Sequence, residues 1–171
     1  MKKSHPAIAL GLATALSLGL AACGSAPTSS ASSSGGSGTT SDFKACMVSD
    51  EGGFDDRSFN QSGKEGLDRA GADFGIETVA VQSTSDADYQ PNITSLIQQK
   101  CNLIIGVGFK LAPALTSAAQ ANADIKFALI DSTFQDSSGG TVQLQNGKPL
   151  IFNTAEAAYL AGYAAAGTTK T

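Results

Sequence analysis

Short apolar segments alternate with segments of helical spacing from residue 43 onward, and this alternation constrains the fold more than any other feature. The strand-like segments are 43–48, 76–81, 102–107 and 126–130. Helical spacing begins at Ser58 or Gln61 and recurs over 89–99, 111–121 and 155–166, while 140–153 reads as a hairpin or a fifth strand. The near-continuous apolar run of 102–107 is typical of a parallel strand covered on both faces. We therefore predict an α/β fold, a Rossmann-like parallel sheet flanked by helices.

The first 22 residues have the pattern of a lipoprotein signal peptide. Lys2 and Lys3 precede an apolar run over 7–20 that is too short for a permanent membrane span. The run closes with Leu-Ala-Ala-Cys-Gly at 20–24, which resembles a lipobox and implies a lipid on Cys23 as the mature N-terminus. An ordinary secretory signal followed by an unmodified cysteine is the alternative. Residues 23–41 then form the lipidated cysteine and a flexible Ser/Gly-rich tether, and 42–171 form one domain.

Charge argues against several kinds of partner. Removal of the signal leaves nine basic and fifteen acidic residues, a net charge of about −6. Nucleic acids and anionic lipid surfaces are therefore poor partners. Attachment to the cell membrane, at its extracytoplasmic face, is expected from the lipid instead.

Two cysteines, Cys46 and Cys101, lie in the predicted domain, in or beside predicted strands. Export to an oxidising compartment permits a disulfide between them. Two separate buried thiols remain the alternative, and no metal-binding spacing is present.

The segment Asp50–Gln61, with the sequence DEGGFDDRSFNQ, joins the first strand to the first helix. Such junctions at the carboxyl ends of parallel strands are where open α/β sheets bind ligands. The candidate ligand-binding residues at these strand ends are Asp50, Phe59, Asn60, Gly108, Phe109 and Asp131.

Structural readings compete for several of these positions. Phe59 falls on the apolar face of its helix and is alternatively a core residue. Asp55 and Asp56 are expected to cap the helix rather than contact a ligand. Gly108 and Phe109 either form the floor of the pocket or only turn the chain.

Four separated motifs resemble the basic membrane protein (BMP) family of substrate-binding lipoproteins of ABC importers, purine nucleoside receptor type. They are DEGGFDDRSFNQ at 50–61, LIIGVGF at 103–109, FALID at 127–131 and EAAYLAGY at 156–163. The resemblance implies the first lobe of a type I periplasmic-binding-protein fold, with the second lobe absent from this sequence. It implies a purine nucleoside ligand and an ABC permease partner.

The resemblance also suggests residue roles. Phe59 would stack on the purine base, Asp50 and Asn60 would hydrogen-bond near the base, and Asp131 would accept hydrogen bonds from ribose hydroxyls. The segment from Tyr159 to Tyr163 is expected to pack on the sheet or near the hinge between lobes.

Three other functions remain open. A receptor of the same fold could bind a sugar or another small solute, and a single lobe could be a surface lipoprotein that binds nothing. A carboxylate–metal nucleoside hydrolase would use Asp50, Asp55, Asp56 and Asp131, but no general acid or nucleophile–base pair is visible. We expect no enzyme activity and no cofactor.

Overall fold

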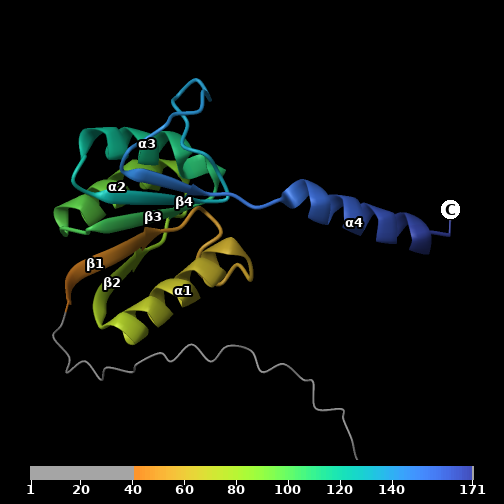
Figure 1. Cartoon of the computed structure of the whole chain (residues 1–171), viewed down its shortest axis with the longest axis horizontal. Coiled ribbons are helices and arrows are strands. Elements are labelled where there is room, and N and C mark those ends of the chain that lie inside the picture. Colours follow the sequence, from red (N-terminus) through yellow and green to blue (C-terminus); the bar gives the residue numbers. More distant parts are fainter. Residues whose placement is uncertain (1–40, 171) are drawn as a thin grey trace, which may run out of the picture. The chain divides into compact units, whose positions relative to one another are not determined.

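The computed structural model describes residues 41–170, which are built around a parallel five-stranded sheet (Figure 1). The strand order is β2-β1-β3-β4-β5, and every neighbouring pair is parallel. The strands are β1 (Ser41–Val48), β2 (Ile76–Val81), β3 (Leu103–Val107), β4 (Lys126–Ile130) and β5 (Gly147–Leu150). The predicted α/β fold is therefore confirmed. Three other predictions lie outside the described residues: the signal peptide, the lipid site at Cys23 and the tether through residue 40.

The helices follow the strands in the predicted alternation. They are α1 (Phe59–Phe74), α2 (Tyr89–Gln98), α3 (Ala112–Ala121) and α4 (Thr154–Thr168), with 3₁₀ turns η1 (Asp86–Asp88) and η2 (Phe109–Leu111). α1 ends at Gly75, which takes a left-handed conformation (φ 63°) and donates its N–H to the Gly71 carbonyl. Strand β2 begins at the next residue, so this glycine forms the tight turn from α1 into β2.

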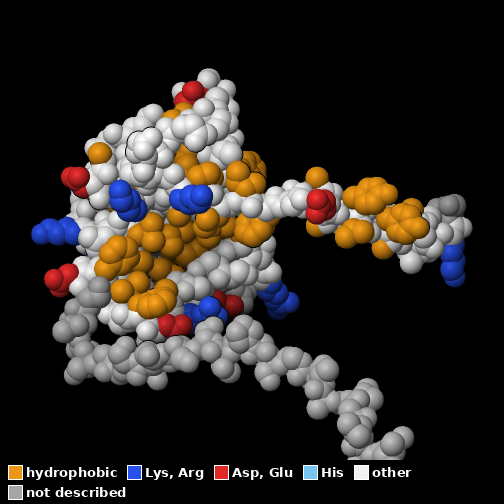
Figure 2. Space-filling view, viewed as in Figure 1, with side chains coloured by type: hydrophobic (Ala, Val, Ile, Leu, Met, Phe, Trp, Pro, Cys, Tyr) orange, Lys and Arg blue, Asp and Glu red, His pale blue; other side chains and the backbone are white. Residues whose placement is uncertain are grey.

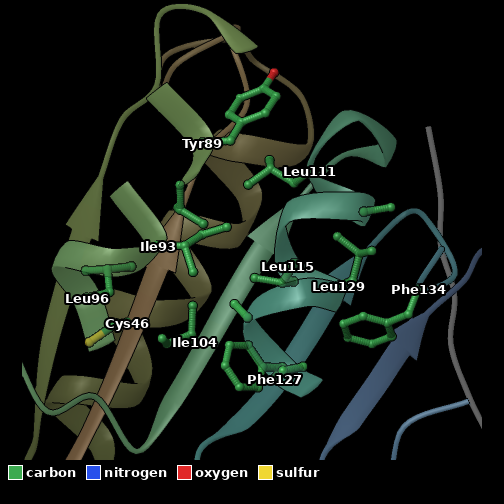
Figure 3. Packing of buried hydrophobic residues seen from close by; sticks show 14 of the residues in the cluster. Cys46, Tyr89, Ile93, Leu96, Ile104, Leu111, Leu115, Phe127, Leu129 and Phe134 are labelled. Atoms are coloured by element: carbon green, nitrogen blue, oxygen red, sulfur yellow. The ribbon is translucent and has the colours of Figure 1, made fainter. Parts of the chain in front are cut away.

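The two faces of the sheet have separate cores. On the face toward α2 and α3, the buried cluster includes Ile93, Ile104, Leu115 and Phe127, which point toward one another (Figure 3). On the face toward α1, the smaller cluster consists of Ala45, Met47, Leu67 and Val107. This two-sided burial explains why the strands read as apolar runs rather than as alternating patterns.

The segment 140–153 contains a fifth strand and not a hairpin arm. Within the described residues it pairs in parallel with β4, from Phe127 opposite Gly147 to Ile130 opposite Leu150. One isolated antiparallel bridge, between Gln135 and Thr141, precedes it. β5 is an edge strand, a position that tolerates the missing N–H of Pro149.

Cys46 and Cys101 form a disulfide, which settles the alternative left open by the sequence. Their Cα atoms are 5.9 Å apart, and both residues are buried. Cys46 lies in β1 and Cys101 lies two residues before β3, the neighbouring strand. Strand order therefore brings together two thiols that are 55 positions apart in sequence.

The sequence predicts that the Tyr159–Tyr163 segment packs on the sheet or near a hinge, and the structure of helix α4 contradicts packing on the sheet. Every residue of α4 is exposed, including Tyr159, Leu160 and Tyr163. Its apolar side chains are distributed around all sides of the helix, a pattern typical of helices that are buried in larger proteins. The prediction that this segment packs on the sheet is therefore wrong for the described chain. The alternative, that it lies near the hinge between lobes, stays a prediction.

Among the described residues, no helix is both long enough and apolar enough to cross a membrane.

Candidate functional site

The sequence-predicted site residues lie at the carboxyl edge of the sheet. Asp50 follows β1, Gly108 and Phe109 follow β3, and Asp131 follows β4. Phe59 and Asn60 are the first residues of α1, which begins above the same edge. The parallel topology thus gathers residues from three connections at one edge.

Asp50 is held in a fixed position by two hydrogen bonds to one of its carboxylate oxygens. The Asn60 side chain donates to Oδ1 at 2.6 Å, and the Gly52 backbone N–H donates to the same atom at 3.0 Å. The backbone N–H of Asp50 in turn donates to the Asn60 Oδ1 at 3.3 Å. The second oxygen, Oδ2, accepts no hydrogen bond from any residue in the described part of the chain.

Asn60 is almost completely buried, with 2% of its surface exposed. Besides Asp50, its side-chain amide donates to Asp56 at 3.0 Å. Asn60 therefore links the strand-end carboxylate to the start of the helix, and this arrangement makes it a positioning residue for Asp50. Its predicted direct contact with a ligand stays a prediction.

Gly108 lies directly against Asp50. Its backbone has φ 92° and ψ 152°, a combination that is essentially restricted to glycine. A Cβ atom at this position would lie 2.6 Å from the Asp50 Oδ2. Gly108 also donates its N–H to the Ile130 carbonyl at 3.0 Å, so the turn after β3 is tied to the end of β4. Glycine is required here because the carboxylate occupies the space of a side chain.

Asp56 caps helix α1, as the sequence indicated. Its carboxylate accepts hydrogen bonds from the backbone N–H groups of Ser58, Asn60 and Gln61 at 2.8, 3.2 and 3.1 Å. Ser58 occupies the N-cap position, but its side chain forms no cap hydrogen bond. Burial alone would raise the pKa of Asp56; the hydrogen bonds from these N–H groups and from the Asn60 amide outweigh burial and lower the pKa below its usual value.

Phe59 is a surface residue rather than a core residue, with 39% of its surface exposed. Its ring contacts the ring of Phe152, with a centroid separation of 5.4 Å and an interplanar angle of 48°. The two rings, Ser58 and Ser62 line an open hollow of about 340 Å³. That volume falls in the lower part of the roughly 300–1,000 Å³ range of small-molecule sites.

Asp131 has a left-handed backbone (φ 63°), which is uncommon for a residue with a side chain. Its backbone N–H donates to the Leu150 carbonyl at 2.9 Å. Its carboxylate is partly exposed and has no hydrogen bond or ion pair with the described residues. Phe109 is also exposed, at 66% of its surface, and it begins η2. Both residues lie at the predicted edge, but no hydrogen bond or ring contact connects either side chain to Asp50 or Phe59 within the described chain.

Sequence reasoning missed two features of this edge. Phe152 lies just beyond β5 and could have been found by applying the strand-end rule to the fifth strand. Lys110 pairs with Glu51 at 2.9 Å and with Asp86 at 3.6 Å, which connects three loops along the rim. The hydrogen bond to Glu51 raises the pKa of Lys110. No sequence signal pairs these three surface residues.

In the part of the chain that the structure describes, no group of three or more His, Cys, Asp or Glu side chains is arranged to hold a metal ion.

Comparisons with known proteins show the family of this chain. Residues 43–171 match the family model Bmp, described as ABC transporter substrate-binding protein PnrA-like. The CD4+ T-cell-stimulating antigen of Listeria innocua is 36% identical over 100% of this chain and 47% of its own length. The ABC transporter nucleoside-binding protein BmpA of Lactococcus lactis is 40% identical over 76% of this chain and 36% of its own length.

Among solved structures, an ABC transporter solute-binding protein of Aeropyrum pernix K1 is similar with a TM-score of 0.61 and 27% identity. The similarity covers 70% of this chain and 31% of that one. The chain therefore spans about half the length, or less, of the relatives that it matches. It belongs to the Bmp family of PnrA-like ABC transporter substrate-binding proteins, and it corresponds to their N-terminal half.

Proposed function

We propose that this chain is the first ligand-binding lobe of an extracytoplasmic solute-binding protein of an ABC importer, and that its ligand is a purine nucleoside. The protein is anchored to the cell membrane by a lipid on Cys23, delivers the nucleoside to an ABC permease and catalyses no reaction. The observation that carries the proposal is the fixed Asp50 carboxylate, with one oxygen unoccupied, at the sheet edge where α1 presents the exposed ring of Phe59. This combination suits a ligand that has both a flat ring and hydrogen-bond donors.

Each part of a nucleoside has a counterpart at the edge. The exposed rings of Phe59 and Phe152 offer apolar surface for a base. Asp50 accepts a hydrogen bond from an N–H of the base, since its Oδ2 is free of other donors in the described chain. Asp131 accepts hydrogen bonds from the ribose hydroxyls, which explains a carboxylate without partners at a strained backbone position. Gly108 packs directly against the Asp50 carboxylate, and Phe109 borders the site.

The second lobe completes the site in this proposal. One lobe leaves the hollow at Phe59 open to solvent, and closure of two lobes around a ligand removes that solvent. The nucleoside-binding relative from Lactococcus lactis supports the choice of ligand class, because it is 40% identical over 134 residues. A sugar would also stack on aromatic rings and hydrogen-bond to the same carboxylates, so the comparison of nucleosides with free ribose decides between the two ligand classes.

The test uses a two-lobed protein, in which this chain is fused to the second half of the Lactococcus lactis BmpA. Isothermal titration with guanosine, adenosine and free ribose measures the ligand class. We expect Phe59→Ala to weaken nucleoside binding roughly 5- to 150-fold, as the loss of about 1–3 kcal/mol of base stacking implies. Phe74→Ala is the matched control, since Phe74 is exposed at the opposite end of the same helix.

Equal affinity for ribose and nucleosides would contradict the nucleoside assignment. Unchanged affinity in both Phe59→Ala and Asp131→Ala would contradict the site itself. The anchor has a separate test, because the intact mass of the protein extracted from its own membrane shows whether Cys23 carries a lipid.

A further inference from the structure

The turn that leads into β5 contains Asn146–Gly147, the one Asn-Gly pair in the sequence. Asparagine is chemically labile, and it is most labile before glycine. Glycine has no side chain to hinder its own backbone nitrogen from attacking the asparagine carboxamide. The chain therefore carries a group prone to spontaneous deamidation at the start of an edge strand.

The Asn146 side chain ties the start of β5 to the connection between α3 and β4. Its Nδ2 donates to the carbonyl oxygens of Ala119, Asn122 and Ile125, at 2.9, 3.0 and 3.0 Å. Ala119 lies in the last turn of α3, where carbonyl groups lack partners within the helix. An ionised carboxylate at position 146 would have no proton to donate to any of them.

Packing, rather than backbone conformation, requires glycine at position 147. A Cβ atom there would lie 2.9 Å from the Leu144 Cβ and 3.0 Å from the Phe134 ring, closer than side chains normally approach. Phe134 is buried in the close-packed core, so the ring has no free space to move into. The fold thus requires both members of the labile pair, each for a separate reason.

The same contacts hold the pair in an unreactive arrangement. Attack requires the Asn146 carboxamide to turn toward the Gly147 nitrogen and so to leave its three carbonyl partners. The backbone is also held, because the Asn146 carbonyl accepts a hydrogen bond from the Phe127 N–H at 2.7 Å and Gly147 pairs with Phe127 in the sheet.

Opening of β5 would release both constraints. β5 has four residues, and β4 is its one neighbour among the described strands. Figure 2 shows hydrophobic and basic side chains at the surface on this side of the sheet. Segments with few buried contacts open at lower free energy than core strands. Local opening of this edge is therefore the event that frees the pair.

We propose that Asn146–Gly147 is a modification site whose deamidation is controlled by the opening of β5. In the opened chain the Gly147 nitrogen forms a bond to the Asn146 Cγ, and the carboxamide nitrogen leaves as ammonia with the proton of the Gly147 N–H. Water then opens the resulting succinimide to aspartate or isoaspartate, and no oxidation or reduction occurs. This inference goes beyond nucleoside binding and does not depend on it.

Either product disfavours the return of β5 to the sheet. The new carboxylate directs negative oxygens at three carbonyl oxygens, and isoaspartate also adds a methylene group to the backbone. β5 supplies the Leu150 carbonyl that accepts the Asp131 N–H, and it directly precedes the segment with Phe152. Deamidation would thus remove support from two residues of the candidate site.

Peptide mapping by mass spectrometry tests whether the fold controls the reaction. The folded chain, the chain unfolded in urea and a synthetic peptide of residues 143–150 are incubated in the same mildly alkaline buffer. We expect deamidation of Asn146 to be at least about tenfold slower in the folded chain than in the peptide, and close to the peptide rate in urea. Hydrogen exchange at the Phe127 amide measures the opening of β5, and its protection should match the slowing of deamidation.

Substitution tests the consequence of the modification. Asn146→Asp reproduces one product, and its thermal unfolding midpoint should lie at least about 4 °C below that of wild type. Asn102→Asp is the matched control, because Asn102 uses its Oδ1 to accept the Lys44 N–H at 2.7 Å and a carboxylate keeps that acceptor. Its midpoint should change by less than about 2 °C.

Three results would overturn the proposal. The first is equal deamidation of Asn146 in the folded chain and in the peptide. The second is slow deamidation without protection of the Phe127 amide, since opening of β5 would then not limit the reaction. The third is an Asn146→Asp variant as stable as wild type. The first two measurements use the wild-type chain, so they remain decisive if Asn146→Asp does not fold.

Discussion

Replacement of Gly108 by alanine should damage both the stability of the lobe and its ligand site. The backbone at Gly108 lies in a region that costs of order 1–3 kcal/mol for a residue with a side chain. The new Cβ would also lie 2.6 Å from the Asp50 Oδ2, which is closer than real Cβ contacts. Asp50 must then move away from the Asn60 and Gly52 donors that hold it at 2.6 and 3.0 Å.

Two measurements separate these effects. Thermal unfolding followed by circular dichroism should show a midpoint about 4–12 °C lower, from the usual few degrees per kcal/mol in a domain of this size. Titration of the two-lobed protein with a nucleoside should show roughly 10- to 150-fold weaker binding, as the loss of one hydrogen bond to a charged group implies.

Gly66→Ala is the matched control. Gly66 lies within α1, and a Cβ there would meet no atom within 4 Å, so alanine should stabilise the lobe by about 0.5–1 kcal/mol. The same chemical change thus has opposite signs at the two glycines. If Gly108→Ala unfolds at the wild-type temperature and binds with wild-type affinity, the argument from the Asp50 contact is refuted.

Further measurements address the disulfide, the cap and the second aromatic ring. Cys46→Ser with Cys101→Ser should lower the free energy of unfolding in urea by about 4 kcal/mol, the loop-closure value for a 55-residue separation; a loss below 1 kcal/mol would contradict it. The pKa of Asp56 is lowered in the folded state, so its contribution to stability is present above about pH 4 and is lost as pH falls through the folded pKa. Unfolding midpoints between pH 2 and 7 should therefore vary less with pH in Asp56→Asn than in wild type, with Asp55→Asn as the control. Phe152→Ala should weaken nucleoside binding to the two-lobed protein at least fivefold while its unfolding midpoint changes by less than 3 °C.

The strands and helices were predictable because each has a strong local pattern. β2 and β4 have the bounds that their apolar runs indicate, and α1 shows its three- and four-residue spacing. β5 was ambiguous because Gly147, Lys148 and Pro149 lack strand character, and its place at the edge explains why the fold accepts them.

The candidate site was predictable only as a set of strand ends. Strand order could not be obtained from local pattern, so neither the disulfide nor the contact between Gly108 and Asp50 could be deduced. The contact of Asn60 with a ligand stays a prediction, but its burial could not be deduced, because whether a side chain points inward or outward at the first turn of a helix depends on the loop before it. Here that loop supplies Asp56, which draws the Asn60 amide inward.

The buried disulfide between β1 and β3 makes the timing of folding depend on the compartment. Its estimated contribution of about 4 kcal/mol is a large share of the roughly 5–15 kcal/mol by which domains are usually stable. On the proposed route to the extracytoplasmic face, the polypeptide would lack this bridge in the reducing cytoplasm and would unfold more readily, which would favour passage through a secretion channel as an extended chain. At the proposed extracytoplasmic location, oxidation of two thiols that are then enclosed by the core locks the sheet after transport.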